Sequence, residues 1–99
     1  MQIEITGHHL DITDALRLHI GKRLEKINAR RSPPLQYMHA VLSVSKKRHS
    51  CGLLARLDSE EFSAQCDASD MYAAIDGAAE KMERQLQSAK GRRAARRNH

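Results

Sequence analysis

The residues with the clearest capacity for chemistry in this sequence are its basic side chains, which outnumber the acidic ones by 17 to 12. They are sorted into blocks: residues 17–56 hold ten Lys or Arg and one Glu, residues 57–83 hold eight acids and one Lys, and residues 84–99 hold six Lys or Arg and no acid. Lysines and arginines gathered in this way create a field that attracts polyanions. The sequence therefore predicts a phosphate-rich partner.

Two groups of basic residues have helical spacing. At 100° per residue, each group falls on one side of its helix, away from the apolar residues of the same segment. The groups are Arg23, Lys26 and Arg30 in segment 13–30, and Lys81, Arg84 and Arg92 in the last segment. If the two helices pack side by side, we expect the rows to be neighbours on the outer surface, with a basic turn at residues 46–49 as a third element.

The aromatic residues limit how such a surface could recognise nucleic acid. Tyr37, Phe62 and Tyr72 are the three aromatic residues, and the spacing of Phe62 and Tyr72 predicts that both belong to the core. A base-stacking sheet needs exposed aromatic rings. We therefore expect contacts with the backbone and shape of structured RNA.

Histidines and cysteines are the other candidates for chemistry. The sequence contains no H-E-x-x-H, C-x-x-C or glycine-rich phosphate loop. Cys51 and Cys66 are too far apart for a zinc motif, and we expect them to be reduced core side chains. His8 and His9 follow a strand and are expected at the surface. The sequence thus predicts no catalytic site, no metal site and no cofactor, and we do not expect an enzyme.

The elements that position these residues follow from apolar spacing. Ile3 and Ile5 alternate with polar residues and predict a strand over 2–6. Thr13 is placed to cap a helix over 13–30, whose apolar residues recur every three or four positions. The proline pair in 32–34 ends that helix. Strands then follow over about 38–46, 51–58 and 61–68, and the segment "KKRHS" (46–50) is expected as a turn.

The last hairpin and the last helix have the most regular patterns. A turn at residues 59–60 would pair Leu57 with Phe62 and Cys51 with Ala68, so that one face of the hairpin is apolar. Ser69 or Asp70 then caps a helix. Its apolar seam is expected to consist of Tyr72, Ile75, Ala79, Met82 and Leu86.

This order of elements predicts an α+β fold of type β-α-β-β-β-α. We expect a four-stranded mixed sheet, with the first two strands parallel and the rest antiparallel, and both helices on one face. Residues 1–90 form the single domain and residues 91–99 a basic, flexible tail. No apolar run approaches the roughly 18 residues that span a bilayer, and no signal segment follows Met1, so we expect a cytoplasmic protein.

Three motifs carry a resemblance to a known family: "ITGHHLDITDAL" (5–16), "DMYAAID" (70–76) and "EKMERQL" (80–86). Over residues 1–90 the chain resembles the ribosome hibernation promoting factors in their short form, relatives of protein Y and of the ribosome-associated inhibitors. The resemblance implies a fold like that of double-stranded-RNA-binding domains. It also implies binding in the small-subunit channel for messenger and transfer RNA, inhibition of translation, and storage of idle ribosomes under stress or in stationary phase in bacteria.

The resemblance and the helical rows together predict the RNA-binding residues. They are Arg23, Lys26, Arg30, Lys46, Lys47, His49, Lys81, Arg84, Lys90 and Arg92. Ser88 departs from the family pattern, in which a lysine often stands there. Asp70 is expected to cap its helix. Asp76 either tethers the loop before the first helix or holds a basic neighbour.

The implied partners are the small ribosomal subunit or the whole ribosome, and by analogy a separate ribosome modulation factor with which short forms pair ribosomes into dimers. We expect no membrane and no small-molecule substrate. The alternative hypothesis is a regulatory protein-binding module, since relatives have been labelled modulators of an alternative sigma factor. Salt-insensitive association with a protein, and no affinity for ribosomes, would characterise it.

Overall fold

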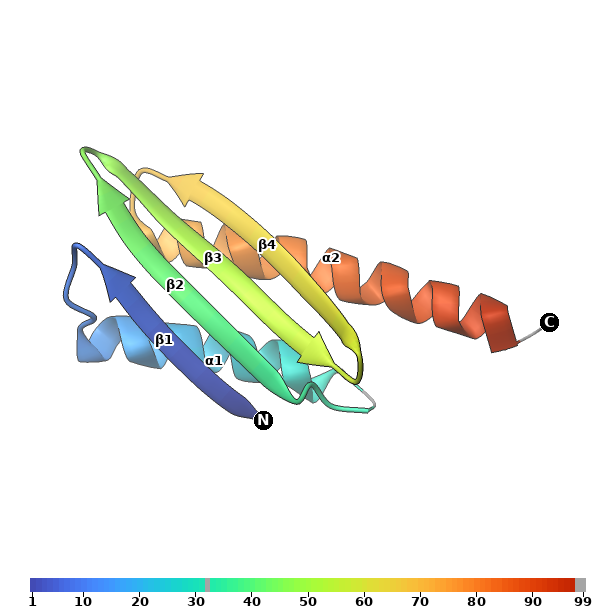
Figure 1. Ribbon diagram of the computed structural model, residues 1–99. Coiled ribbons are helices and arrows are strands. Elements are labelled where there is room, and N and C mark those ends of the chain that lie inside the picture. The colour runs from blue at the N-terminus through green and yellow to red at the C-terminus, as the bar shows by residue number, and fades with distance from the viewer. Residues whose placement is uncertain (32, 98–99) are drawn as a thin grey trace.

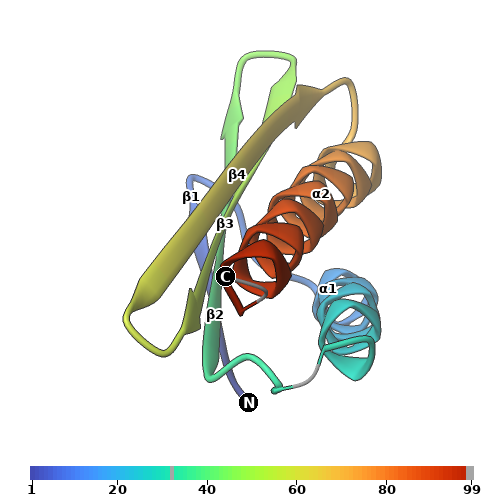
Figure 2. The ribbon, with the colours of Figure 1, turned by 90° about the vertical axis from the view of Figure 1, so that its right-hand side faces the viewer.

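The computed structural model describes the backbone of residues 1–31 and 33–97, with side chains described up to residue 91. The elements are β1 (Gln2–His8), α1 (Asp14–Ala29), β2 (Tyr37–Ser45), β3 (Arg48–Leu57), β4 (Glu60–Ala68) and α2 (Met71–Arg97). They form one sheet of order β1-β2-β3-β4, in which β1 and β2 are parallel and the other pairs are antiparallel. Both helices cover the same face of the sheet (Figures 1 and 2). The predicted fold class is confirmed.

The helix α1 begins where its cap predicts. The Thr13 hydroxyl accepts a hydrogen bond from the backbone N–H of Leu16 at 3.2 Å, which satisfies one of the open donors of the first turn. Its buried side chains are Leu16, Ile20, Leu24 and Ile27, as the spacing predicts. After α1 ends, the Asn28 side chain accepts from the N–H of Leu35 at 2.7 Å and ties the connection to the helix. Ser32 of the predicted proline stop lies outside the described residues.

The β2–β3 turn is shorter than predicted. Lys46 and Lys47 alone form it, and Arg48 and His49 already belong to β3. Lys46 has a φ of 58°, the left-handed conformation that a tight turn between antiparallel strands requires. The two turn lysines are exposed, whereas His49 is half-buried.

The predicted register of β3 and β4 is wrong by two residues. Leu57 pairs with Glu60, Ala55 with Phe62, and Cys51 with Cys66. The turn consists of Asp58 and Ser59 in place of Ser59 and Glu60, and Asp58 has a φ of 57°. Aspartate tolerates this conformation better than most residues. A shift by two keeps every side chain on its predicted face, so the apolar pattern could not distinguish the two registers.

Charge explains why the observed register is preferred. The predicted turn would place Asp58 opposite Glu61, which are two like charges. In the structure Arg56 lies opposite Glu61, and its Nη2 donates to Glu61 Oε1 at 2.6 Å. Opposite charges in directly facing positions stabilise a strand pair, and like charges destabilise it.

The core lies between the helices and the inner face of the sheet, and no polar or charged residue is buried in the described part of the chain. In α2 the prediction holds for Ile75, Ala79, Met82 and Leu86, all of which are buried. It is wrong for Tyr72, whose side chain is 43% exposed. Met71, one position earlier, is buried in its place, because Met71 lies closer to the centre of the apolar stripe than Tyr72 does.

The helix α2 continues to Arg97, so the first part of the basic tail is helical in the structure. The helix extends beyond the sheet in Figure 1. The domain boundary at residue 90 stays a prediction. Within the described residues, no helix is long and apolar enough to cross a membrane.

Candidate nucleic-acid interface

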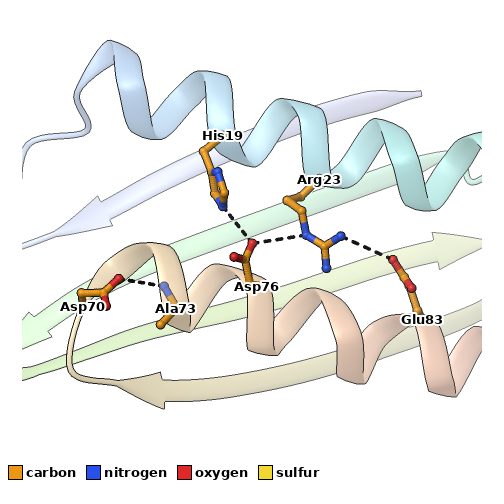
Figure 3. A network of polar contacts seen from close by, with 6 residues as sticks. All are labelled: His19, Arg23, Asp70, Ala73, Asp76 and Glu83. Atoms are coloured by element: carbon orange, nitrogen blue, oxygen red, sulfur yellow. Dashed lines mark hydrogen bonds and ion pairs between the residues drawn. The ribbon is translucent and has the colours of Figure 1, made fainter.

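A polar network joins α1 to the side of α2 that faces it (Figure 3). The His19 Nε2 atom lies 2.8 Å from Asp76 Oδ1, and the Arg23 Nε atom lies 3.3 Å from the same oxygen. The Nη1 atom of Arg23 is 3.9 Å from Glu83 Oε1. Of the two roles open for Asp76, the structure supports the second: its carboxylate holds basic neighbours on α1.

This network changes the environment of Arg23, which is one of the predicted RNA-binding residues. Its side chain is 20% exposed and lies between the carboxylates of Asp76 and Glu83. A carboxylate nearby lowers the field that a guanidinium presents to solvent. Arg23 would therefore have to exchange or share these partners to contact a phosphate.

The other acid of the "DMYAAID" motif has a different role. Asp70 Oδ1 accepts from the backbone N–H of Ala73 at 2.9 Å (Figure 3). Asp70 thus caps α2, as predicted, and such a cap contributes about 1 kcal/mol. Its charge also lies at the positive end of the helix dipole.

A cationic groove lies where the C-terminal end of α1 meets the middle of α2. Its volume is about 230 Å³, and it is lined by Ile27, Arg30, Arg31, Glu83, Leu86, Gln87 and Lys90. Ile27 and Leu86 are fully buried, so the cations project from an apolar base. The predicted residues Arg30 and Lys90 are both exposed and meet here, although they are 60 positions apart in the sequence. Lys26 is exposed on the same flank of α1.

Arg31 belongs to this groove but was not among the predicted residues. Its Nη2 atom donates to the backbone carbonyl of Leu86 at 3.3 Å, which links the end of α1 to α2. The residue follows the helix and has no place in a helical row, so spacing could not identify it. The available signal is the pair of arginines at 30–31, directly after the amphipathic helix α1.

Lys81 and Arg84 of α2 lie on a different side of the helix from the groove. Lys81 Nζ donates to the backbone carbonyl of Gln65 on β4 at 2.8 Å, and Gln85 donates to the carbonyl of Ser63. Arg84 is 78% exposed, 4.0 Å from Glu80, and borders a hollow with Phe62. The two predicted rows are therefore not neighbours, because α2 turns Lys81 and Arg84 towards β4 while α1 faces Asp76 and Glu83.

The basic turn lies far from the groove. The strand β2 has nine residues, Tyr37–Ser45, which is roughly 30 Å at the usual rise per residue, and the turn at Lys46 and Lys47 follows its last residue. Figure 1 shows the turn and the end of α1 at opposite ends of the sheet. His49 is partly buried and its Nδ1 atom has no hydrogen-bond partner in the described part of the structure. The side chain of Arg92 lies outside the described residues.

The two cysteines are free and face each other on β3 and β4. Burial, with a smaller effect of the neighbouring Cys66, raises the pKa of Cys51 to about 12. Cys51 is therefore a neutral thiol near pH 7 and behaves as a core side chain, as expected. Cys66 is only partly buried.

Comparison with known proteins finds relatives over most of the chain. The chain is 36% identical over 86 residues to the ribosome hibernation promoting factor of Salmonella typhimurium. The matched segment covers 87% of this chain and 90% of the relative. The same protein of Escherichia coli is 35% identical over the same coverage.

Two solved structures have the same fold. A ribosomal subunit interface protein from Coxiella burnetii superposes with a TM-score of 0.85 at 30% identity, covering 92% of this chain and 99% of that one. The N-terminal domain of Thermus thermophilus Protein Y superposes with a TM-score of 0.80 at 28% identity, covering 89% and 98%. The family described as Sigma 54 modulation protein / S30EA ribosomal protein matches residues 3–94, and the chain belongs to this family.

Proposed function

We propose that this protein is a ribosome hibernation factor. It binds the small ribosomal subunit, or the whole ribosome, through ribosomal RNA in the channel for messenger and transfer RNA. In this way it inhibits translation and helps to store inactive, dimerised ribosomes in the cytoplasm, where a separate ribosome modulation factor is a candidate partner. Its role is binding and not catalysis.

The observation that carries this proposal is the cationic groove between α1 and α2. Arg30 and Lys90 are exposed there, and neither has an ion-pair partner among the described residues. Cations without internal partners are available to neutralise phosphates, whereas a paired cation must first leave its carboxylate. The relatives named ribosome hibernation promoting factor and ribosomal subunit interface protein support the ribosome as the source of those phosphates.

The remaining predicted contacts extend this surface. Lys26 continues the groove along α1, Arg84 lies on the outer side of α2, and Lys46 and Lys47 offer a second point of contact at the other end of the sheet. Lys81, His49 and Arg23 belong to the proposed set as well, but each is engaged or partly covered within the domain. We propose that the exposed cations make the first contacts with RNA.

Co-sedimentation with separated small subunits, large subunits and whole ribosomes tests the function. We expect saturable binding at about one copy per small subunit or whole ribosome, none to large subunits, and a log-log salt slope of about −0.7 to −0.9 per phosphate neutralised. The double reversal Lys26→Glu with Arg84→Glu should abolish binding without unfolding the domain, because both side chains are exposed. Arg17→Glu, exposed on the other flank of α1, is the control and should bind normally.

A second candidate function follows from the description of the family, which includes modulation of sigma 54. A domain of that type would bind a protein partner with little dependence on salt and would not sediment with any ribosomal fraction. Absence of ribosome binding in every fraction would favour this candidate. Normal binding of the Lys26/Arg84 double reversal would instead leave the ribosome as partner and contradict the assigned surface.

A further inference from the structure

The groove between α1 and α2 contains a carboxylate among its cations. Glu83 lines it together with Arg30, Arg31 and Lys90. Glu83 pairs with Arg23 of α1, but towards a phosphate in the groove its carboxylate is repulsive and offers no hydrogen-bond donor. The position of Glu83 therefore indicates a ligand that brings a donor as well as a negative charge.

The hydrogen-bonding capacity of Glu83 is not filled within the domain. Its Oε1 atom is buried and accepts no hydrogen bond from any described residue; the nearest cation is Arg23 Nη1, at 3.9 Å, beyond hydrogen-bond distance. The side chain as a whole is 30% exposed and lines the groove, so a ligand there meets the part of Glu83 other than the buried Oε1. Figure 3 shows Glu83 extending from α2 towards α1, with its carboxylate facing the guanidinium of Arg23. Buried acceptors without donors are rare in native proteins, and each calls for an explanation.

The chemistry of RNA supplies a matching pair of groups. Each ribose carries a 2′-hydroxyl, which can donate a hydrogen bond, close to the phosphate of the same nucleotide. We propose that the groove binds one ribose–phosphate unit of RNA, with Arg30 and Lys90 contacting the phosphate and Glu83 accepting the hydrogen bond of the 2′-hydroxyl. This inference depends on the proposed RNA-binding function and adds to it a residue that distinguishes RNA from DNA.

The test compares three oligonucleotide hairpins of one sequence, made of RNA, DNA and 2′-O-methyl RNA, by fluorescence anisotropy at low salt. The 2′-O-methyl hairpin keeps the A-form shape but cannot donate from the 2′ position. We expect the wild-type protein to bind RNA roughly tenfold more tightly than either of the other hairpins. This ratio corresponds to the lower end of the free energy that a hydrogen bond to a charged group contributes.

Two substitutions at position 83 isolate the carboxylate. Glu83→Gln keeps a weaker acceptor, and Glu83→Met has a similar shape without one, so the preference for RNA should fall from wild type to Gln to Met. Both variants lose a negative charge and so bind all three hairpins more tightly; the ratio of affinities cancels that common effect. Glu80→Gln is the matched control, because Glu80 is exposed on the same helix and does not line the groove. Its ratio should equal that of wild type.

The outcomes separate this inference from the function on which it depends. If wild type binds the RNA and 2′-O-methyl hairpins equally, or if the Gln and Met variants keep the preference, the role of Glu83 is overturned while RNA binding stands. If wild type binds ribosomes but none of the hairpins, the ribose–phosphate assignment is overturned alone. If it binds neither, both proposals fail. Should Glu83→Met fail to fold, the comparison of wild-type affinity for the RNA and 2′-O-methyl hairpins, together with Glu83→Gln, still tests the role of Glu83.

Discussion

The two flanks of α2 use polar side chains in opposite ways. On the α1 flank, the acids Asp76 and Glu83 hold His19 and Arg23 of the other helix. On the β4 flank, Lys81 and Gln85 donate to backbone carbonyls of β4, which is an edge strand of the sheet. Such donors also cover part of the exposed edge of β4, which would otherwise be open to pairing with another chain. The comparison teaches that a basic residue on this helix can serve the fold or the partner, depending on which acceptor faces it.

The contacts on both flanks depend on how α2 packs on the sheet. A substitution that disrupts this packing should therefore cause the largest loss of stability. Ile75→Asp places a charge at a side chain that is 1% exposed and should lower the free energy of unfolding by about 4 kcal/mol or more. Chemical denaturation followed by circular dichroism measures this. Tyr72→Asp is the control, because Tyr72 is 43% exposed and its ring lies against that of His19, at 5.0 Å between centroids. A loss as large as that of Ile75→Asp would contradict the exposed placement of Tyr72.

The next largest loss of stability is expected where α2 lies closest to β4. A Cβ atom at Gly77 would lie 2.4 Å from the Cys66 sulfur, so Gly77→Ala should destabilise the protein by about 1–3 kcal/mol. Gly91→Ala meets nothing within 4 Å and should stabilise the helix by roughly 0.5–1 kcal/mol. Thermal melts of both variants provide the comparison. Adding Cys66→Ala to Gly77→Ala should restore most of the loss, and failure to do so would show that the sulfur is not the cause.

Asp76→Asn tests the α1 flank. The substitution removes the charge that faces His19 and Arg23, and we expect a loss of about 0.5–1 kcal/mol, since all three side chains are partly exposed and solvent screens their interaction. A double-mutant cycle with Arg23→Gln measures the part that comes from this pair. Additive effects of the two substitutions would mean that Asp76 acts mainly through His19.

The smallest effects should separate the flanks in RNA binding. Lys90→Met removes an exposed cation of the groove. It should reduce the slope of log affinity for the ribosome against log salt concentration by about 1. Lys81→Met removes a donor that already bonds Gln65, so it should cost up to about 1 kcal/mol of stability and change the slope less. The slopes come from co-sedimentation at several salt concentrations. An equal or larger change for Lys81→Met would mean that Lys81 leaves the strand to contact RNA.

Much of the fold could be predicted from local patterns. The alternation in β1 and β2, the cap at Thr13 and the apolar spacing of α1 define elements whose interactions lie within a few residues in the sequence. The register of β3 and β4 could not be chosen in this way, because a shift by two preserves the apolar face. Tyr72 was assigned to the core since it lies at the edge of the apolar stripe, where spacing does not separate a buried position from an exposed one.

The candidate site divides in the same manner. The sequence by itself determined that the chain carries rows of cations on two helices, and that Lys26, Arg30 and Arg84 are exposed on them, because solvent-facing helix positions follow from a period of 3.6 residues. Helical spacing placed Lys90 nearer the apolar seam, and the structure shows that it is exposed. Only the tertiary structure decided which acceptor each cation meets. The packing of α2 on the sheet turns Lys81 to β4 and Glu83 to α1, and contacts between residues 16 to 60 positions apart depend on that packing.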